Sequence, residues 1–404
     1  MKLAQIDLYD QEKYARGGPP QDEFALLRRE DPLHWHAKEE PGGRGYWAVT
    51  KHADIVRMSK DPATFSSYAG GTLIRDYAEE HLEPMRLMLL NMDPPQHAKF
   101  RRLVSTGFTP RMIERLRPHV RERTTAILDR VAPRGECDFV REIAAELPLQ
   151  VIGDLLGIPE EDREKIFHWT NQLMGFDDPE YQVSVEDGVR AAGEMWAYAH
   201  ELATKRKGTS AEDLAGVLMN ATVDGEQLTE AEFDSFFLLL AVAGNETTRN
   251  ATSGGMLALI EHPEEREKLL ANPALLPSAV EEILRWTCPQ IYMRRTATRD
   301  VEMRGKTVKA GDKLAMYYTS ANRDEEVFSD PLSFKVDRAP NDHLTFGVGQ
   351  HFCLGANLAR LELTIMFEEI LRRMPEPRLA GPLRRLRSNY MNGIKAMPLA
   401  FRAT

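Results

Sequence analysis

A ten-residue segment towards the C-terminal end, Phe346 to Gly355, combines a single cysteine with glycines, aromatic side chains and a histidine. Cys353 directly precedes an apolar periodic run over residues 354–374 that predicts a helix. A sulfur at a helix N-terminus faces unpaired N–H groups and the positive end of the helix dipole, which both favour a thiolate. Gly347, Gly349 and Gly355 let the backbone take positive φ and approach a flat ligand closely. A thiolate with an apolar wall and no second cysteine nearby suits the axial ligand of a haem.

The alternative for a lone cysteine is a buried structural residue, and the spacing of all ten residues argues against it. The segment matches in full the cysteine-ligand loop of the cytochromes P450, and the chain resembles that family through five motifs in order from about Trp47 to its C-terminus. The resemblance implies haem b as cofactor with Cys353 as the iron ligand. Further cofactor-binding residues implied in this loop are Phe346, Gly347, His351 and Gly355.

A long helix is predicted between a capping box, Thr229 with Glu232, and Pro263, which ends it. Its centre carries the string Ala243-Gly244-Asn245-Glu246-Thr247-Thr248 after an apolar run. A glycine costs a helix about 1 kcal/mol relative to alanine, and a buried carboxylate costs more unless it is paired or protonated. Polar residues that break such local rules often mark function. The alternative is a helix-packing notch beside a solvated acid.

The same string is similar to the oxygen-binding motif of the cytochromes P450, Ala-Gly-x-(Asp/Glu)-Thr. By resemblance, Ala243 and Gly244 leave room for the cofactor, and Thr247 with Glu246 and water forms the catalytic proton relay. The acid is glutamate here, whereas aspartate is commoner in the family.

Three basic residues are candidates for holding the carboxylates of the cofactor. His97 and Arg101 lie four residues apart and therefore share one face of the helix that follows Pro94-Pro95. A solvated basic face is the alternative, but in the resembled family this pattern donates to a haem propionate. Arg295, in an alternating segment that predicts a strand over residues 290–298, resembles a second propionate-binding arginine. Glu282 and Arg285 resemble the family's buried ion-pair network, which is structural.

Bulk properties narrow the class of protein. The 404 residues are 42% hydrophobic and 28% charged, and the net charge of −10 argues against nucleic acid as a general partner. Three cysteines without metal-type spacing indicate a reducing compartment. With no signal-peptide pattern and no apolar run of membrane length, we expect a cytoplasmic protein without a membrane anchor, like the soluble bacterial-type branch of the family.

The resemblance implies one cytochrome P450 domain over residues 1–404 that is mainly α with a smaller β-rich part. The β-rich parts are expected at about 40–60, 290–320 and 385–404, and the helical parts at about 90–285 and 354–374. A strand at 46–50, a helix at 51–60 and a hairpin over 301–316 are predicted within them. The haem should lie between the long central helix and the cysteine loop.

The function that the resemblance implies is a monooxygenase that inserts one atom of O₂ into an apolar C–H bond. Its electrons would come from an iron–sulfur ferredoxin served by an NAD(P)H-dependent reductase, and we expect a monomer. A peroxide-driven peroxygenase is an alternative, against which the acid–threonine pair argues. A haem-binding sensor without turnover and a cysteine-nucleophile hydrolase are further alternatives. Lys99, Arg102 and Arg360 are candidates for the ferredoxin-docking face.

The substrate is expected to be neutral and apolar. The candidate pocket offers methyl groups, one phenol and no fixed charge, through Thr72, Leu240, Ala243, Ile291, Tyr292, Met293 and Met391. In such a pocket, a ligand gains about 25 cal/mol of binding free energy per Å² of apolar area that it buries, and ligands are selected by shape. A carboxylate or ammonium ligand would lose hydration without gaining a partner. A terpenoid or alkyl-aromatic compound is the first expectation, and a steroid-like lipid is the second.

Overall fold

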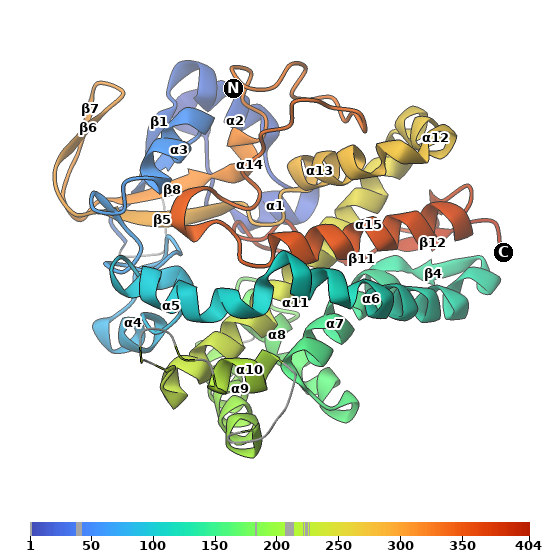
Figure 1. The fold of residues 1–404 in the computed structure, drawn as a ribbon. Coiled ribbons are helices and arrows are strands. Elements are labelled where there is room, and N and C mark those ends of the chain that lie inside the picture. The colour runs from blue at the N-terminus through green and yellow to red at the C-terminus, as the bar shows by residue number, and fades with distance from the viewer. Residues whose placement is uncertain are drawn as a thin grey trace.

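The computed structural model describes residues 2–37, 43–181, 184–206, 214–220, 222, 225 and 227–404. Helices fill most of the molecule (Figure 1). Strands β1, β5, β6, β7 and β8 lie on one side of it, and β4, β11 and β12 lie on the other, near the C-terminus. The helices before the central one are α1 Gln11–Gly17, α2 Gln21–Glu30, α3 His52–Ser59, α4 Glu79–Met85, α5 Gln96–Ser105, α6 Pro110–Val131, α7 Glu146–Leu156, α8 Arg163–Met174, α9 Val185–Arg206 and α10 Leu214–Asn220. The others are α11 Glu230–Glu261, α12 Pro263–Ala271, α13 Leu276–Thr287, α14 Tyr318–Ala321 and α15 Ala356–Arg373. The expected mainly α fold with a smaller β-rich part is confirmed.

The largest sheet has five strands in the order β1-β2-β8-β5-β3. These strands are β1 Leu33–His36, β2 Tyr46–Val49, β3 Phe65–Ser66, β5 Tyr292–Ala297 and β8 Lys313–Tyr317. β2 pairs in parallel with β8, and β8 pairs antiparallel with β5, so that segments far apart in the sequence lie side by side. Every residue of β8 is buried, as expected for a central strand covered on both faces.

The predicted hairpin over 301–316 is shorter in the structure. It consists of β6 Val301–Met303 and β7 Lys306–Val308, and it projects from the edge of the molecule (Figure 1). Residues 313–317, which were predicted as part of the hairpin, form β8 of the large sheet instead, because they are buried between β2 and β5. The remaining strands form two small sheets, β4 Glu136–Asp138 with β12 Pro398–Ala400 and β9 Arg378–Leu379, and β10 Arg384–Arg385 with β11 Ile394–Ala396. β4 lies within the part predicted to be helical.

α11 runs through the centre of the molecule (Figure 1). The predicted capping box is present, since the Glu232 N–H donates to Thr229 Oγ1 at 3.2 Å and the Thr229 N–H donates to Glu232 Oε2 at 2.9 Å. The helix packs against α7, α8, α9, α13 and α15. Functional residues from several segments can therefore meet along it. No helix in the described part of the chain is both long and apolar enough to cross a membrane.

The expected Glu282–Arg285 pair is buried, and both side chains have 0% exposure. Arg285 donates to the Glu282 carboxylate at 2.7 and 2.8 Å, and Arg338 Nε donates to it at 3.0 and 3.1 Å. Arg285 also donates to the carbonyls of Asn322 and Pro331. This network ties α13 to the irregular chain that leads into the cysteine loop, as predicted for a structural pair.

Replacing Glu282 with glutamine is expected to lower the free energy of unfolding by about 3–5 kcal/mol, because it leaves two buried guanidinium groups without their counter-charge. Urea unfolding would measure the change. Glu30→Gln is the control, since the Arg29–Glu30 pair is exposed and such pairs contribute about 0–1 kcal/mol. Equal losses for the two variants would contradict a structural role for the buried network.

Candidate functional site

The cysteine loop closes on itself immediately before α15. The Cys353 N–H donates to the Phe346 carbonyl at 2.8 Å. Gly347 and Gly349 have φ values of +69° and +77°, in the left-handed region that favours glycine, whereas the positive φ expected at Gly355 is wrong, since Gly355 caps α15 with a φ of −85°. A Cβ on Gly349 would lie 2.6 Å from the Ser59 carbonyl oxygen at the end of α3, so only glycine fits there. The predicted glycine-rich turn is therefore required by the backbone.

The Cys353 thiol is enclosed by protein and yet accessible. Its side chain is accessible. The surrounding protein atoms nevertheless desolvate the sulfur and raise the pKa of the thiol, whereas the Gly355 N–H and the charges of Arg101 and Arg360 lower that pKa. A sulfur that is both accessible and desolvated lies on the wall of an internal space rather than on the outer surface. The charges that oppose the rise are those that stabilise a thiolate.

A cluster of donors surrounds the same space. The rings of His97 and His351 have centroids 4.3 Å apart. Burial, together with Arg101 and Arg295, lowers the pKa of His97 to about 4, against the opposing effect of Asp93. Burial, Arg295, His97 and Arg101 lower the pKa of His351 to about 2. Both imidazoles are therefore neutral near pH 7, beside two guanidinium cations. The buried His97 Nε2 has no hydrogen-bond partner within the described part of the chain, so the cluster offers donors to an anion.

The groove predicted on α11 is present at Ala243. Its side chain is exposed although it lies in the middle of a helix that is packed on several sides. Thr247, one turn later on the same face, donates its hydroxyl hydrogen to the Ala243 carbonyl at 2.6 Å. The small Ala243 side chain and the Thr247 hydroxyl are therefore neighbours along this groove.

Gly244 faces the neighbouring helix α7. A Cβ on Gly244 would lie 3.0 Å from the Ile152 side chain of that helix. The missing side chain thus lets α11 pack closely on α7, because a methyl group there would require Ile152 to move.

The Glu246 carboxylate is buried and paired on its own helix. It forms an ion pair with Arg249 and accepts a hydrogen bond from Asn250 Nδ2 at 3.0 Å. Arg249 Nη1 donates in turn to Asn171 Oδ1 of α8 at 2.8 Å. Partners of this kind offset the cost of burying a carboxylate. Glu246 is therefore held by partners on α11, and Arg249 connects this pair to α8, while the Thr247 hydroxyl bonds back to the α11 backbone.

The candidate pocket residues come from four segments, and the structure brings most of them together. Ile291, Tyr292 and Met293 lie at the start of β5, and Met391 is bridged to Gln290 directly before them. The Arg294 N–H donates to the Thr72 carbonyl at 2.8 Å, which fixes the Thr72 segment beside the same strand. Leu240 and Ala243 lie on α11. Most of the set is buried, namely Ile291, Met391, Tyr292, Thr72 and Leu240, whereas Met293 is partly exposed and Ala243 is exposed.

Comparisons with known proteins identify the family of the chain. A family model described as Cytochrome P450 matches residues 192–374. The methyl-branched lipid omega-hydroxylase of Mycobacterium tuberculosis is 43% identical, over 99% of this chain and 94% of the relative. The steroid C26-monooxygenase of Rhodococcus jostii is 43% identical, over 98% of this chain and 85% of the relative. The chain belongs to the cytochrome P450 family.

Solved structures of cytochromes P450 share the fold over nearly the whole chain. A cytochrome P450 of Mycobacterium marinum in complex with pseudoionone has a TM-score of 0.90 and 37% identity, and the match covers 98% of each chain. A cytochrome P450 of Bacillus megaterium in complex with testosterone has a TM-score of 0.83 and 32% identity, and the match covers 95% of this chain and 99% of that chain. The chain is thus a cytochrome P450 monooxygenase.

The residues present fit a haem. Cys353 supplies a thiol whose local charges favour a thiolate, and the unpartnered His97 Nε2 with the guanidinium groups of Arg101 and Arg295 supplies donors for two carboxylates. The small side chain of Ala243 leaves the α11 face of the same space open. All of these residues belong to the motifs predicted from the sequence.

Two residues of the site were missed by sequence reasoning. Arg249 lies three residues after Glu246, so a helical ion pair could have been predicted from spacing alone. Asn171 gives no comparable signal, because its contact with Arg249 joins α8 to α11 across a long stretch of sequence.

Proposed function

We propose that this cytochrome P450 binds haem b through Cys353 and hydroxylates a neutral, branched or polycyclic lipid with electrons from an iron–sulfur ferredoxin. The observation that carries the proposal is the accessible, enclosed Cys353 sulfur with Arg101, His97 and Arg295 around the same space. The guanidinium groups and the neutral histidines would hold the two propionates. Their position favours a cofactor plane between the cysteine loop and α11.

The bound haem would supply the activation of O₂, and the protein would control protons and water around it. The Thr247 hydroxyl, which donates to the Ala243 carbonyl, is placed to hold a water at the groove and to pass on its proton. Glu246 is engaged by Arg249 and Asn250, so its part in the relay requires a water or a side-chain rotation between it and Thr247. Phe346, Gly347, His351 and Gly355 would shape the proximal side, and Gly244 would act through helix packing.

The proposed substrate is a terpenoid or a steroid-like lipid in preference to an alkyl-aromatic compound. Two relatives that match nearly the whole chain are named for methyl-branched lipids and for steroids. The clustered Thr72, Tyr292, Met293 and Met391 are apolar apart from one hydroxyl and one phenol and carry no fixed charge, which suits such a molecule. A lipid of this size gains affinity from buried area and not from a fixed charge.

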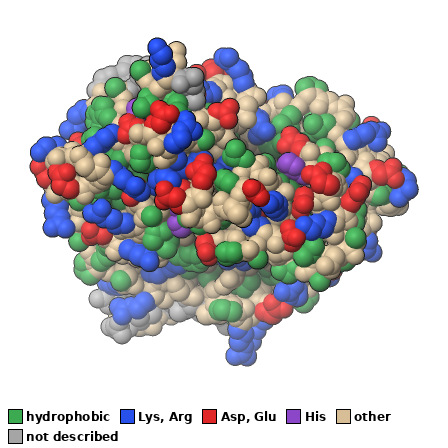
Figure 2. Space-filling view, turned by 90° about the horizontal axis from the view of Figure 1, so that it is seen from above, with side chains coloured by type: hydrophobic (Ala, Val, Ile, Leu, Met, Phe, Trp, Pro, Cys, Tyr) green, Lys and Arg blue, Asp and Glu red, His purple; other side chains and the backbone are tan. Residues whose placement is uncertain are grey.

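The ferredoxin would dock beneath the cysteine loop. Arg360 is engaged there, since it donates to Glu281 at 2.7 and 2.8 Å and lies over the Phe346 ring at 4.6 Å. It therefore holds the loop, and we propose Lys99 and Arg102, which belong to α5, as further basic residues of the docking face for an acidic partner. Figure 2 shows one face of the molecule, over which basic and acidic side chains are interspersed. Three free cysteines support a reducing compartment, and we propose a monomer in the cytoplasm.

Reconstitution tests this function. The purified protein with haem, a bacterial iron–sulfur ferredoxin, its reductase and NADPH should convert a branched terpenoid or a sterol to a singly hydroxylated product detected by mass spectrometry. Omission of the ferredoxin should remove most of the product. Equal turnover with hydrogen peroxide alone, at physiological concentration and without the ferredoxin, would favour the peroxygenase instead.

A further inference from the structure

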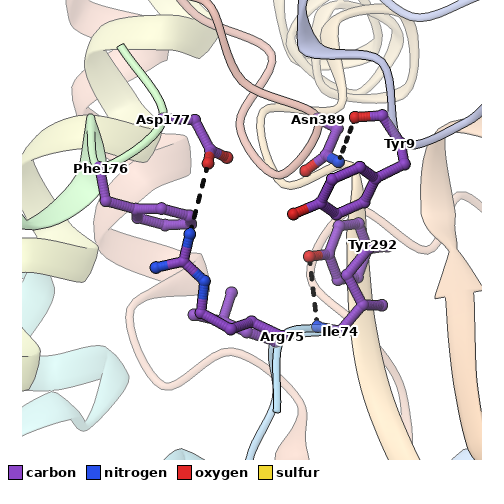
Figure 3. Close-up of a pocket in the computed structure, with 8 residues that line it drawn as sticks. Tyr9, Ile74, Arg75, Phe176, Asp177, Tyr292 and Asn389 are labelled. Atoms are coloured by element: carbon purple, nitrogen blue, oxygen red, sulfur yellow. Dashed lines mark hydrogen bonds and ion pairs between the residues drawn. The ribbon is translucent and has the colours of Figure 1, made fainter. Parts of the chain in front are cut away.

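Two ion pairs lie beside internal spaces of the molecule, and they differ in their neighbours. Arg75 and Asp177 line the small cavity shown in Figure 3, and both also have further contacts with the protein. Arg360 and Glu281 lie against the loop that carries Cys353. The charges of this second pair can therefore act on the iron ligand.

Arg360 is held between a carboxylate and an aromatic ring. Its Nε and Nη2 donate to the two carboxylate oxygens of Glu281 at 2.7 and 2.8 Å, a bidentate geometry that fixes the plane of the guanidinium. The guanidinium carbon lies 4.6 Å from the centroid of the Phe346 ring. The Phe346 carbonyl in turn accepts the hydrogen bond from the Cys353 N–H at 2.8 Å. Arg360 thus contacts the residue that closes the cysteine loop.

The Glu281 carboxylate has a second partner, His343. The Thr345 N–H donates to His343 Nδ1 at 3.3 Å, so His343 Nε2 carries the hydrogen, and it lies 3.2 Å from Glu281 Oε2. The His343 side chain is only 3% exposed. Glu281 of α13 therefore connects the chain before Cys353 to α15, which follows it.

Both members of the pair are charged near pH 7. Burial acts to raise the pKa of Glu281, but the hydrogen bonds of Arg360 and His343, together with the Arg360 charge, outweigh it and hold that pKa at about 2. The hydrogen bond to Glu281 raises the pKa of Arg360, although burial opposes the rise. The Arg360 charge acts on Cys353 in the direction that favours a thiolate. Because Glu281 places the opposite charge next to Arg360, the sulfur experiences a weaker positive field.

The pair lies close to the cysteine along α15. Arg360 is four residues after Ala356, the first residue of the helix, or about 6 Å along its axis. Side chains on a helix lean towards its N-terminus, so the Arg360 charge lies on the order of 10 Å from the Cys353 sulfur. The side chains of Arg360 and Glu281 are 34% and 29% exposed, so solvent screens their charges only in part.

We propose that Glu281 is a positioning residue for the haem–thiolate site: it holds Arg360 against Phe346 and offsets the Arg360 charge, and thereby keeps the reduction potential of the bound haem low. The inference rests on the proposed function, because it needs haem bound through Cys353. Hydrogen bonds and charges around an iron ligand set the potential of such sites. Glu281 acts through Arg360 rather than by contact with the iron ligand.

The affected step is the transfer of one electron from the reduced ferredoxin, whose cluster is oxidised, to the ferric iron, which becomes ferrous. This electron adds one negative charge to the site. A cation without its counter-charge therefore favours the reduced form, and a carboxylate without its cation disfavours it. A unit charge about 10 Å away in a partly buried environment changes such an equilibrium constant about tenfold, which corresponds to about 59 mV for one electron.

An equilibrium redox titration of the purified holoenzyme, with a dye mediator and without ferredoxin, measures this potential. Glu281→Gln should raise it by about 59 mV, a tenfold change in the equilibrium constant, because Arg360 then lacks its counter-charge. Arg360→Gln should lower it by a similar amount, because Glu281 remains negative. Glu281→Asp keeps the charge and should stay near the wild-type value. The double variant Glu281→Gln with Arg360→Gln should also return to that value, since neither charge remains.

Arg372→Gln is the matched control. Arg372 belongs to the same helix and is 66% exposed, and it lies about 18 Å further along the axis than Arg360, so the potential should not change. Potentials of Glu281→Gln and Arg360→Gln that equal the wild-type value, or that move in the same direction, would overturn the proposal. A merely structural role would not make the two shifts opposite in sign.

The carbon monoxide spectrum of the wild type separates this inference from the proposed function. Absence of the red-shifted Soret band would refute the proposed function. The band together with unchanged potentials in both charge variants would refute the role of Glu281 alone.

Discussion

Replacing Cys353 with alanine is expected to abolish the red-shifted Soret band of the reduced, carbon monoxide-bound protein. That band requires a thiolate ligand, and Cys353 is the cysteine at the enclosed, charge-stabilised position beside Arg101 and Arg360. The Gly355 N–H lies against its sulfur and α15 begins at the next residue, so the thiolate has partners that an alanine cannot engage. Monooxygenase turnover should fall to background with the band.

The other two cysteines are the controls. Cys137 and Cys288 are buried, and burial raises the pKa of each thiol to about 12, which keeps both protonated near pH 7. Cys137→Ala and Cys288→Ala should keep the red-shifted band, with some loss of stability from the cavity left behind. A red-shifted band that survives in Cys353→Ala would show that another residue holds the iron.

Replacing Thr247 with alanine is expected to lower the product formed per NADPH at least about tenfold and to release the reducing equivalents as hydrogen peroxide. Proton delivery by a positioned group contributes about 10²–10⁴-fold to rates, and the Thr247 hydroxyl is the one at the α11 groove beside Ala243. Substrate affinity should change little, since the removed atoms are few. Product yield, NADPH consumption and peroxide are measured in the same reaction.

Thr252→Ala is the matched control on the same helix. Its hydroxyl donates to the Thr248 carbonyl at 2.9 Å, as Thr247 does to Ala243, but Thr252 is buried. The control should form as much product per NADPH as the wild type. An equal amount of product per NADPH in Thr247→Ala and in the wild type would exclude Thr247 from the relay.

Features fixed by local chemistry were predicted from the sequence. The capping box at Thr229 and the end of α11 before Pro263 follow from hydrogen-bonding and backbone rules that act within a few residues. The Glu282–Arg285 pair follows from helical spacing, and its burial came from the family resemblance. The glycine-rich turn before Cys353 was predicted because its backbone needs glycine at Gly347 and Gly349.

Features that depend on partners far along the chain were not predicted. β8 pairs with β2 and β5 because the assembled sheet buries it, and the alternating pattern around residues 301–316 fits a hairpin equally well. Gly244 faces Ile152, which belongs to another helix. Asn171 and Asp177 acquire their contacts with Arg249 and Arg75 only when the α8 region packs on the rest of the molecule. Residue types alone do not specify such tertiary contacts.

The central claim is that this cytochrome P450 inserts oxygen from O₂ into an apolar substrate. Turnover under ¹⁸O₂ with the ferredoxin system, followed by mass spectrometry of the alcohol product, tests it most directly. One labelled oxygen atom per product molecule is the predicted result. A product whose new oxygen comes from water would contradict the claim.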